Sequence, residues 1–176
     1  MITLDKERIF KMALAFMKVT KKPDEFLTES LELGYEELLK AADFRHIFAL
    51  SDDDKSILPG KSVQKHMANH TQFYYFAATL GQSVDVLIKK TQLSSMSRAV
   101  VIDALAGAML DDYCDKVCGE AMPDTATKRF SPGYGDMPLS FQDTLLAKCR
   151  GEKLGIKVLP SKLLIPSKSI TAVIGV

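Results

Sequence analysis

Hydrophobic residues recur at helical spacing in two stretches near the N-terminus. Over residues 4–18 and again over residues 24–42, apolar side chains return every three or four positions, which is the period of one helix face. Pro23 marks the start of the second stretch, and Gly34 interrupts it. The pattern predicts two amphipathic helices.

Two short runs in the middle of the chain are typical of strands. Residues 44–50 read FRHIFAL and residues 73–80 read FYYFAATL, and both are rich in aromatic and branched side chains. Between them, residues 61–69 predict a short helix after the turn at residues 58–60. Beyond the second run, Ser83 is placed to cap another short helix.

The longest predicted helix runs over residues 96–118. It contains no proline and only Gly107 as an internal break, and it is apolar on nearly all sides through Leu110. That pattern is typical of a buried central helix. Ser94 or Ser95 is placed to cap it.

The C-terminal third begins with an irregular segment. Residues 123–138 hold most of the local proline and glycine, and Ser140 with Asp143 resembles a capping box for a helix that ends near Arg150. The final residues, 156–176, alternate branched side chains with prolines and end as a strand.

Helices before, between and after a few strands predict an α+β fold. We expect a single domain in which the central buried helix packs on a curved mixed or antiparallel sheet. Residues 1–43 form an N-terminal helical segment of this compact unit, and residues 44–176 form its main part. No internal repeat or long linker separates two domains.

Composition excludes several classes of partner and location. The 176 residues carry a net charge of +1, which gives no electrostatic argument for nucleic acid or an anionic membrane. No apolar run approaches the roughly 20 residues of a membrane span. The N-terminus lacks the apolar core of a signal peptide. Three cysteines, an odd number, favour a reducing cytoplasm over a disulfide framework.

The sequence RFSPGYGD, Arg129–Asp136, combines groups suited to binding a small ligand. Pro132 and Gly133 predict a type II turn, which would leave backbone N–H groups exposed at Gly133, Tyr134 and Gly135. The Arg129 guanidinium suits a carboxylate or phosphate, and the Tyr134 ring suits a flat base or a cation. The alternative is an ordinary surface turn.

Acidic residues crowd the end of the predicted central helix. Asp111, Asp112 and Asp115 lie where the helix dipole is already negative. One explanation is solvation beside lysines such as Lys116. The other is that the acids receive a cation carried by a ligand, which together with Arg129 would suit an amino-acid zwitterion.

The order of five segments resembles the reactivation domain of cobalamin-dependent methionine synthase, especially its short stand-alone forms. The segments are LPGKSVQKHM, FYYFAATLG, VVIDALAGAML with DDYCDKV, RFSPGYGDMPLSFQ and SKSITAVIGV. The resemblance covers approximately residues 44–176, and R-x-x-x-G-Y is its S-adenosylmethionine-binding signature.

The resemblance implies which residues hold S-adenosylmethionine. Arg129 and the backbone around Ser131 and Gly133 would hold the methionine moiety, while Tyr134 shapes the pocket. The acidic residue that the family places on the preceding helix falls at Asp115. Asp5 and Asp24 are candidates for its N-terminal acidic contact.

The resemblance also implies the function. The chain would act as the detached reactivation component of the synthase, a methyltransferase, and support reductive remethylation of inactive cobalamin. The cobalamin would be carried by a separate corrinoid protein, and a flavodoxin or reductase would supply the electron. Such chemistry needs no catalytic side chain from this protein. The alternatives are a reactivator of another corrinoid methyltransferase, or a non-catalytic docking module for a corrinoid protein.

A pair of histidines is a further candidate for ligand binding. His66 and His70 lie four residues apart on a predicted helix, where two imidazoles are able to share a metal ion. No third ligand is evident nearby, so we expect no metal site.

Overall fold

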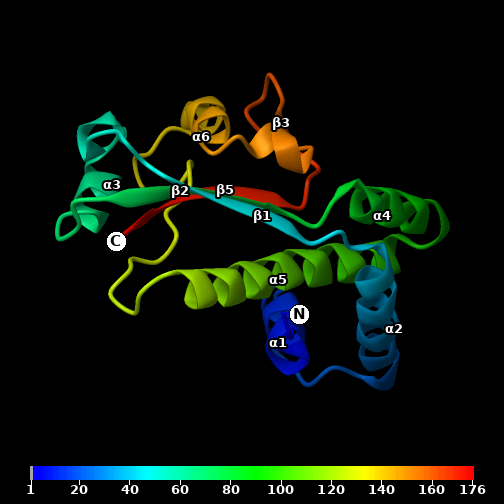
Figure 1. Cartoon of the computed structure of the whole chain (residues 1–176). Helices are drawn as coiled ribbons and strands as arrows, with labels where there is room; N and C mark the ends of the chain where they lie inside the picture. The colour runs from blue at the N-terminus through cyan, green and yellow to red at the C-terminus, as the bar shows by residue number, and fades with distance from the viewer. Residues whose placement is uncertain (1) are drawn as a thin grey trace. The chain divides into compact units, whose positions relative to one another are not determined.

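The computed structural model describes residues 2–176 and has an α+β fold, as predicted (Figure 1). The helices are α1 (Lys6–Phe16), α2 (Glu25–Ala41), α3 (Lys61–His66), α4 (Gln82–Ser94), α5 (Met96–Ala121) and α6 (Gln142–Lys148). The strands are β1 (Arg45–Leu50), β2 (Phe73–Thr79), β3 (Lys157–Val158), β4 (Leu164–Ile165) and β5 (Ser169–Gly175). Short 3₁₀ helices lie at η1 (Lys55–Ile57), η2 (Leu139–Phe141) and η3 (Gly151–Leu154).

The chain forms two compact units, and each is assembled from two separate stretches. Unit 1 combines the residues up to Phe44 with Leu80–Cys118, and unit 2 combines Arg45–Thr79 with Gly119–Val176. The division of the sequence into residues 1–43 and 44–176 remains a prediction.

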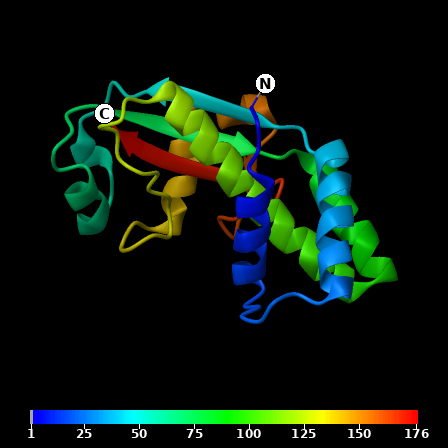
Figure 2. The same ribbon diagram turned by 90° about the horizontal axis from the view of Figure 1, so that it is seen from below.

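Unit 1 is helical. In Figure 2, α1 crosses α5, and α2 lies beside α4. The predicted interruption of α2 at Gly34 is wrong, because the helix continues through this residue. A Cβ atom at Gly34 would lie 3.0 Å from a methyl carbon of Leu105 on α5. The glycine therefore permits the close approach of α2 and α5 instead of ending α2.

Unit 2 contains the sheet. Its strand order is β1-β2-β5, and both pairings are antiparallel, which confirms the antiparallel arrangement. Helix α6 lies against β2 and β5 (Figure 1). The core of the unit is lined by buried side chains from the strands, α3, α6 and the connecting loops, among them Val63, Met67, Phe73, Tyr75, Phe141, Leu145, Ile156 and Val173.

The predicted helix cap at Ser95 is present, whereas the caps predicted at Ser83 and at Ser140 with Asp143 are not. The Ser95 hydroxyl accepts a hydrogen bond from the Arg98 amide at 3.3 Å, so this cap is confirmed. Helix α4 instead starts after Gly81, at φ 80°, with no side-chain cap. Helix α6 continues directly from η2, so the capping box predicted at Ser140 and Asp143 is wrong. A preceding 3₁₀ turn replaces the side-chain cap there.

Cys114 and Cys149 are buried, and Cys118 is partly buried. Within residues 2–176, none of the helices combines the length and the apolar character needed to cross a membrane.

Candidate functional site

The RFSPGYGD loop begins as an added edge of the sheet in unit 2. Phe130 pairs with Val173 on β5 as an antiparallel bridge, with N–O distances of 3.0 and 2.9 Å. Phe130 packs against the core of unit 2. Arg129 and Ser131 flank this bridge in the sequence.

The predicted type II turn is present at Pro132 and Gly133. The Tyr134 amide donates to the Ser131 carbonyl oxygen at 3.1 Å, and Gly133 has φ 93°. A second turn follows, in which the Met137 amide donates to the Tyr134 carbonyl and the Gly133 amide donates to the Met137 carbonyl. The expectation of exposed amides at Gly133 and Tyr134 is therefore wrong, because both amides are used to close the loop.

Asp136 fastens the end of the loop to helix α3. Its carboxylate accepts hydrogen bonds from the amides of Lys61 at 2.7 Å and Ser62 at 2.9 Å. These amides hold the pKa of the Asp136 carboxyl below its usual range. Helix α3 begins after Gly60 without a cap of its own, so Asp136 serves as a cap from a distant part of the chain. Sequence reasoning missed this role, although an uncapped short helix is a detectable signal.

Aromatic rings line one side of the loop. The Tyr134 ring stands edge-on to Phe130, with centroids 6.1 Å apart, and Phe130 in turn lies 5.1 Å from the His66 ring. His66 Nε2 donates to the Lys128 carbonyl oxygen at 2.8 Å. Tyr134 itself is 57% exposed. The loop thus presents a supported aromatic surface to solvent.

Ser131 is a polar residue of the loop that has a buried, unsatisfied side-chain atom. The residue is 8% exposed, and its buried Oγ atom makes no hydrogen bond within residues 2–176. A buried hydroxyl left in this state costs about 1–3 kcal/mol, and such groups are uncommon in folded proteins. Arg129, two residues earlier, is partly buried. The Ser131 hydroxyl therefore fits a ligand that supplies a hydrogen-bonding partner.

Asp115, the fifth predicted site residue, belongs to unit 1 and is already paired within the chain. Arg8 on α1 forms ion pairs with both Asp112, at 3.0 Å, and Asp115. Asp112 is fully buried and also accepts the Asp5 amide at 2.9 Å. Arg8 thus supplies from within the chain the cation that sequence reasoning sought in a ligand. Whether Asp115 also contacts a ligand remains a prediction.

The two N-terminal acids have structural roles in unit 1. The Asp5 side chain accepts from the Arg8 amide and caps α1, and the Asp24 side chain accepts from the Leu27 amide and caps α2. These bonds satisfy amides at the helix starts. The ion pairs of Arg8 were not predicted from the sequence, because its partner Asp112 lies 104 residues away along the chain.

The two histidines do not lie on one helix as predicted, because α3 ends at His66 and His70 lies beyond it. His66 is engaged with the Lys128 carbonyl. Among residues 2–176, no group of three or more histidine, cysteine or acidic side chains is placed to hold a metal ion.

Comparisons with known proteins bear on the fold. No family model matches the sequence, and no curated protein sequence matches it. A crystal structure of the MetH reactivation domain bound to AdoHcy is similar to this chain, with a TM-score of 0.65 and 12% sequence identity. The similarity covers 97% of this chain and 74% of that domain. The chain therefore has the fold of the MetH reactivation domain, which confirms at the level of the fold the resemblance found in the sequence.

Proposed function

We propose that the RFSPGYGD loop binds the amino-acid end of an adenosyl ligand of the S-adenosylmethionine type. The observation that carries the proposal is the buried Ser131 hydroxyl without a partner, on a chain with the fold of a domain that was crystallised with AdoHcy. The loop is rigid, because two turns close it and Asp136 anchors it. A rigid loop loses little entropy when it binds a ligand.

Four residues of the loop have separate roles in this proposal: Arg129, Ser131, Gly133 and Tyr134. The Arg129 guanidinium pairs with the ligand carboxylate, since its planar fork matches two carboxylate oxygens. The Ser131 hydroxyl completes the polar contacts at the buried end of the site. The exposed Tyr134 ring covers the apolar part of the ligand. Gly133 contributes the turn that brings these groups together.

We further propose that the bound ligand takes part in a methyl transfer. S-adenosylmethionine supplies a transferable methyl group when it is bound. The protein would position that ligand for the reductive remethylation of cobalamin held by a separate corrinoid protein, with an electron from a flavodoxin or reductase. No side chain of this chain needs to act as a nucleophile or base, because alignment alone contributes about 7–11 kcal/mol to such steps.

Isothermal calorimetry with S-adenosylmethionine and AdoHcy tests the site. We expect saturable binding to the intact chain, weakened about tenfold or more in Arg129→Ala, because charged hydrogen bonds contribute about 1.5–3 kcal/mol. Ser131→Ala should weaken binding roughly 2- to 10-fold, as loss of one neutral hydrogen bond does. Lys128→Ala is the matched control, since Lys128 is exposed and its carbonyl, not its side chain, contacts His66.

Two outcomes separate the proposal from its alternatives. Equal binding by Arg129→Ala and Lys128→Ala would show that the ligand binds elsewhere. No measurable binding by the intact chain would reject the adenosyl site and leave a docking module for a corrinoid protein.

A further inference from the structure

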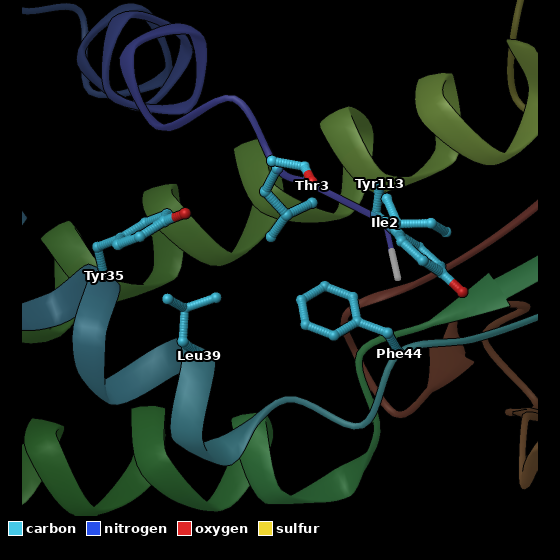
Figure 3. Close-up of a pocket in the computed structure, with 7 residues that line it drawn as sticks. Ile2, Thr3, Tyr35, Leu39, Phe44 and Tyr113 are labelled. Carbon is cyan, nitrogen blue, oxygen red and sulfur yellow. The ribbon is translucent and has the colours of Figure 1, made fainter.

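Unit 1 contains a cavity that the RFSPGYGD loop does not line. Its volume is about 530 Å³, within the range of small-molecule sites. Figure 3 shows open space between the side chains of Tyr35 and Leu39 on α2, Thr3 on the N-terminal segment and Phe44. Ile2, Leu4 and Tyr113 complete the lining.

The lining has a distinctive chemistry. It contains three aromatic rings, aliphatic side chains and one threonine, and it contains no charged residue. The Phe44 and Tyr113 rings lie 5.0 Å apart at an interplanar angle of 52°. Tyr35 is steadied by an edge-on contact with Phe10 and by the Lys6 ammonium, 5.3 Å from its ring centroid. A lining of packed aromatic rings that contains no charged side chain suits a flat, neutral ligand.

The wall formed by residues 2–4 is followed by a hydrogen bond to a buried carboxylate. Directly after it, the Asp5 amide donates to the fully buried Asp112 carboxylate at 2.9 Å. Arg8 neutralises this carboxylate, with an N–O distance of 3.0 Å. Tyr113, the neighbour of Asp112, lines the cavity. The N-terminal wall and the α5 wall are therefore joined next to the cavity, so its shape is set before any ligand binds.

We propose that this cavity is a binding site for a neutral, planar molecule of one or two fused aromatic rings. The ligand stacks on or stands edge-on to Phe44, Tyr35 and Tyr113, and Leu39 closes one side. A tyrosine hydroxyl is uncharged at neutral pH, and burial raises the pKa of Tyr113 further, to about 12. The proposal depends on unit 1 alone and is independent of the adenosyl site proposed for unit 2.

Indole is the probe that tests the proposal on the full chain. The protein contains no tryptophan, so indole emission is observed without background from that residue. We expect a saturable shift of the indole emission on addition of protein. Nuclear Overhauser contacts should connect indole to the ring protons of Tyr35, Phe44 and Tyr113. Tryptamine, which adds an ammonium group, should bind about tenfold more weakly or worse, because the lining offers that charge no partner.

A matched pair of variants locates the site. Leu39→Phe adds a ring at the cavity and should weaken indole binding about tenfold or more. Leu93→Phe makes the same change at a residue of α4 that is 91% exposed and outside the lining, and it should bind indole as the parent chain does. Neither variant introduces tryptophan.

Three results would overturn the proposal. They are the absence of saturable indole binding, Overhauser contacts to other aromatic residues, and equal weakening in the two variants. The Overhauser contacts are measured on the unmodified chain, so the proposal stays testable even if Leu39→Phe does not fold.

Discussion

Gly135 shows how the absence of one side chain shapes the candidate site. The residue has φ 54°, and a Cβ atom there would lie 2.6 Å from the Ser62 Oγ atom. The next residue, Asp136, holds the amides of Lys61 and Ser62. Glycine is therefore required both for the backbone conformation and for the close approach of the loop to α3.

Replacing this glycine should release the loop. Gly135→Ala places a methyl group against Ser62 and forces alanine into the left-handed region, which alone costs about 1–2 kcal/mol. We expect a lower free energy of unfolding in urea and weaker S-adenosylmethionine binding. The control is Gly119→Ala in α5, where a Cβ atom meets nothing within 4 Å. That change should raise stability by about 0.5–1 kcal/mol, so equal effects of the two substitutions would contradict this account.

At the scale of elements, helix α6 stabilises the sheet that carries the loop. Leu145 of α6 is fully buried in the core of unit 2. Gln142, also on α6, accepts a hydrogen bond from the buried Thr171 hydroxyl on β5. Since β5 pairs with the loop at Phe130, the packing of α6 helps to hold the edge on which the site is built.

Shortening the buried Leu145 side chain of α6 should destabilise unit 2. Leu145→Ala leaves a cavity in a fully buried position, and such changes cost about 2–5 kcal/mol. Leu163→Ala removes the same atoms from a side chain that is 59% exposed and should change stability by about 0.5 kcal/mol or less. Urea unfolding followed by circular dichroism measures both. A loss of less than about 1 kcal/mol in Leu145→Ala would mean that the core relaxes around the missing atoms.

At the scale of the whole molecule, the N-terminal residues are part of a core and not an appendage. Ile9 and Leu38 are fully buried in unit 1, which they share with Leu80–Cys118. The α5 residues Ile102 and Leu105 are also fully buried there, and Gly34 of α2 approaches both closely. Removing α1 and α2 would expose this apolar surface of α5.

A chain that begins at residue 44 should therefore not fold as a stable monomer. We expect it to bind the dye 8-anilinonaphthalene-1-sulfonate, to associate in size-exclusion chromatography, and to lack the cooperative thermal transition of the full chain. If this fragment melted cooperatively at the temperature of the full chain, residues 44–176 would be an independent domain.

Local patterns were sufficient to predict most elements. The periods of α1, α2 and α5 and the aromatic runs of β1 and β2 give the observed elements within a few residues. The type II turn at Pro132 and Gly133 was predictable because its geometry depends on adjacent residues alone. The cap predictions at Ser83 and Ser140 failed because the backbone before a helix is able to replace a side-chain cap.

The sequence by itself determined the α+β class and placed Arg129, Ser131 and Tyr134 in one loop around the turn at Pro132 and Gly133. Only the tertiary structure decided which polar groups satisfy one another. Asp136 caps a helix 75 residues earlier, and Arg8 pairs with Asp112 across 104 residues. The sequence-based predictions did not separate Asp112, which is fully buried, from its neighbour Asp111. The physical reason is that local conformation depends on neighbouring residues, whereas burial and ion pairing depend on what the folded chain brings near.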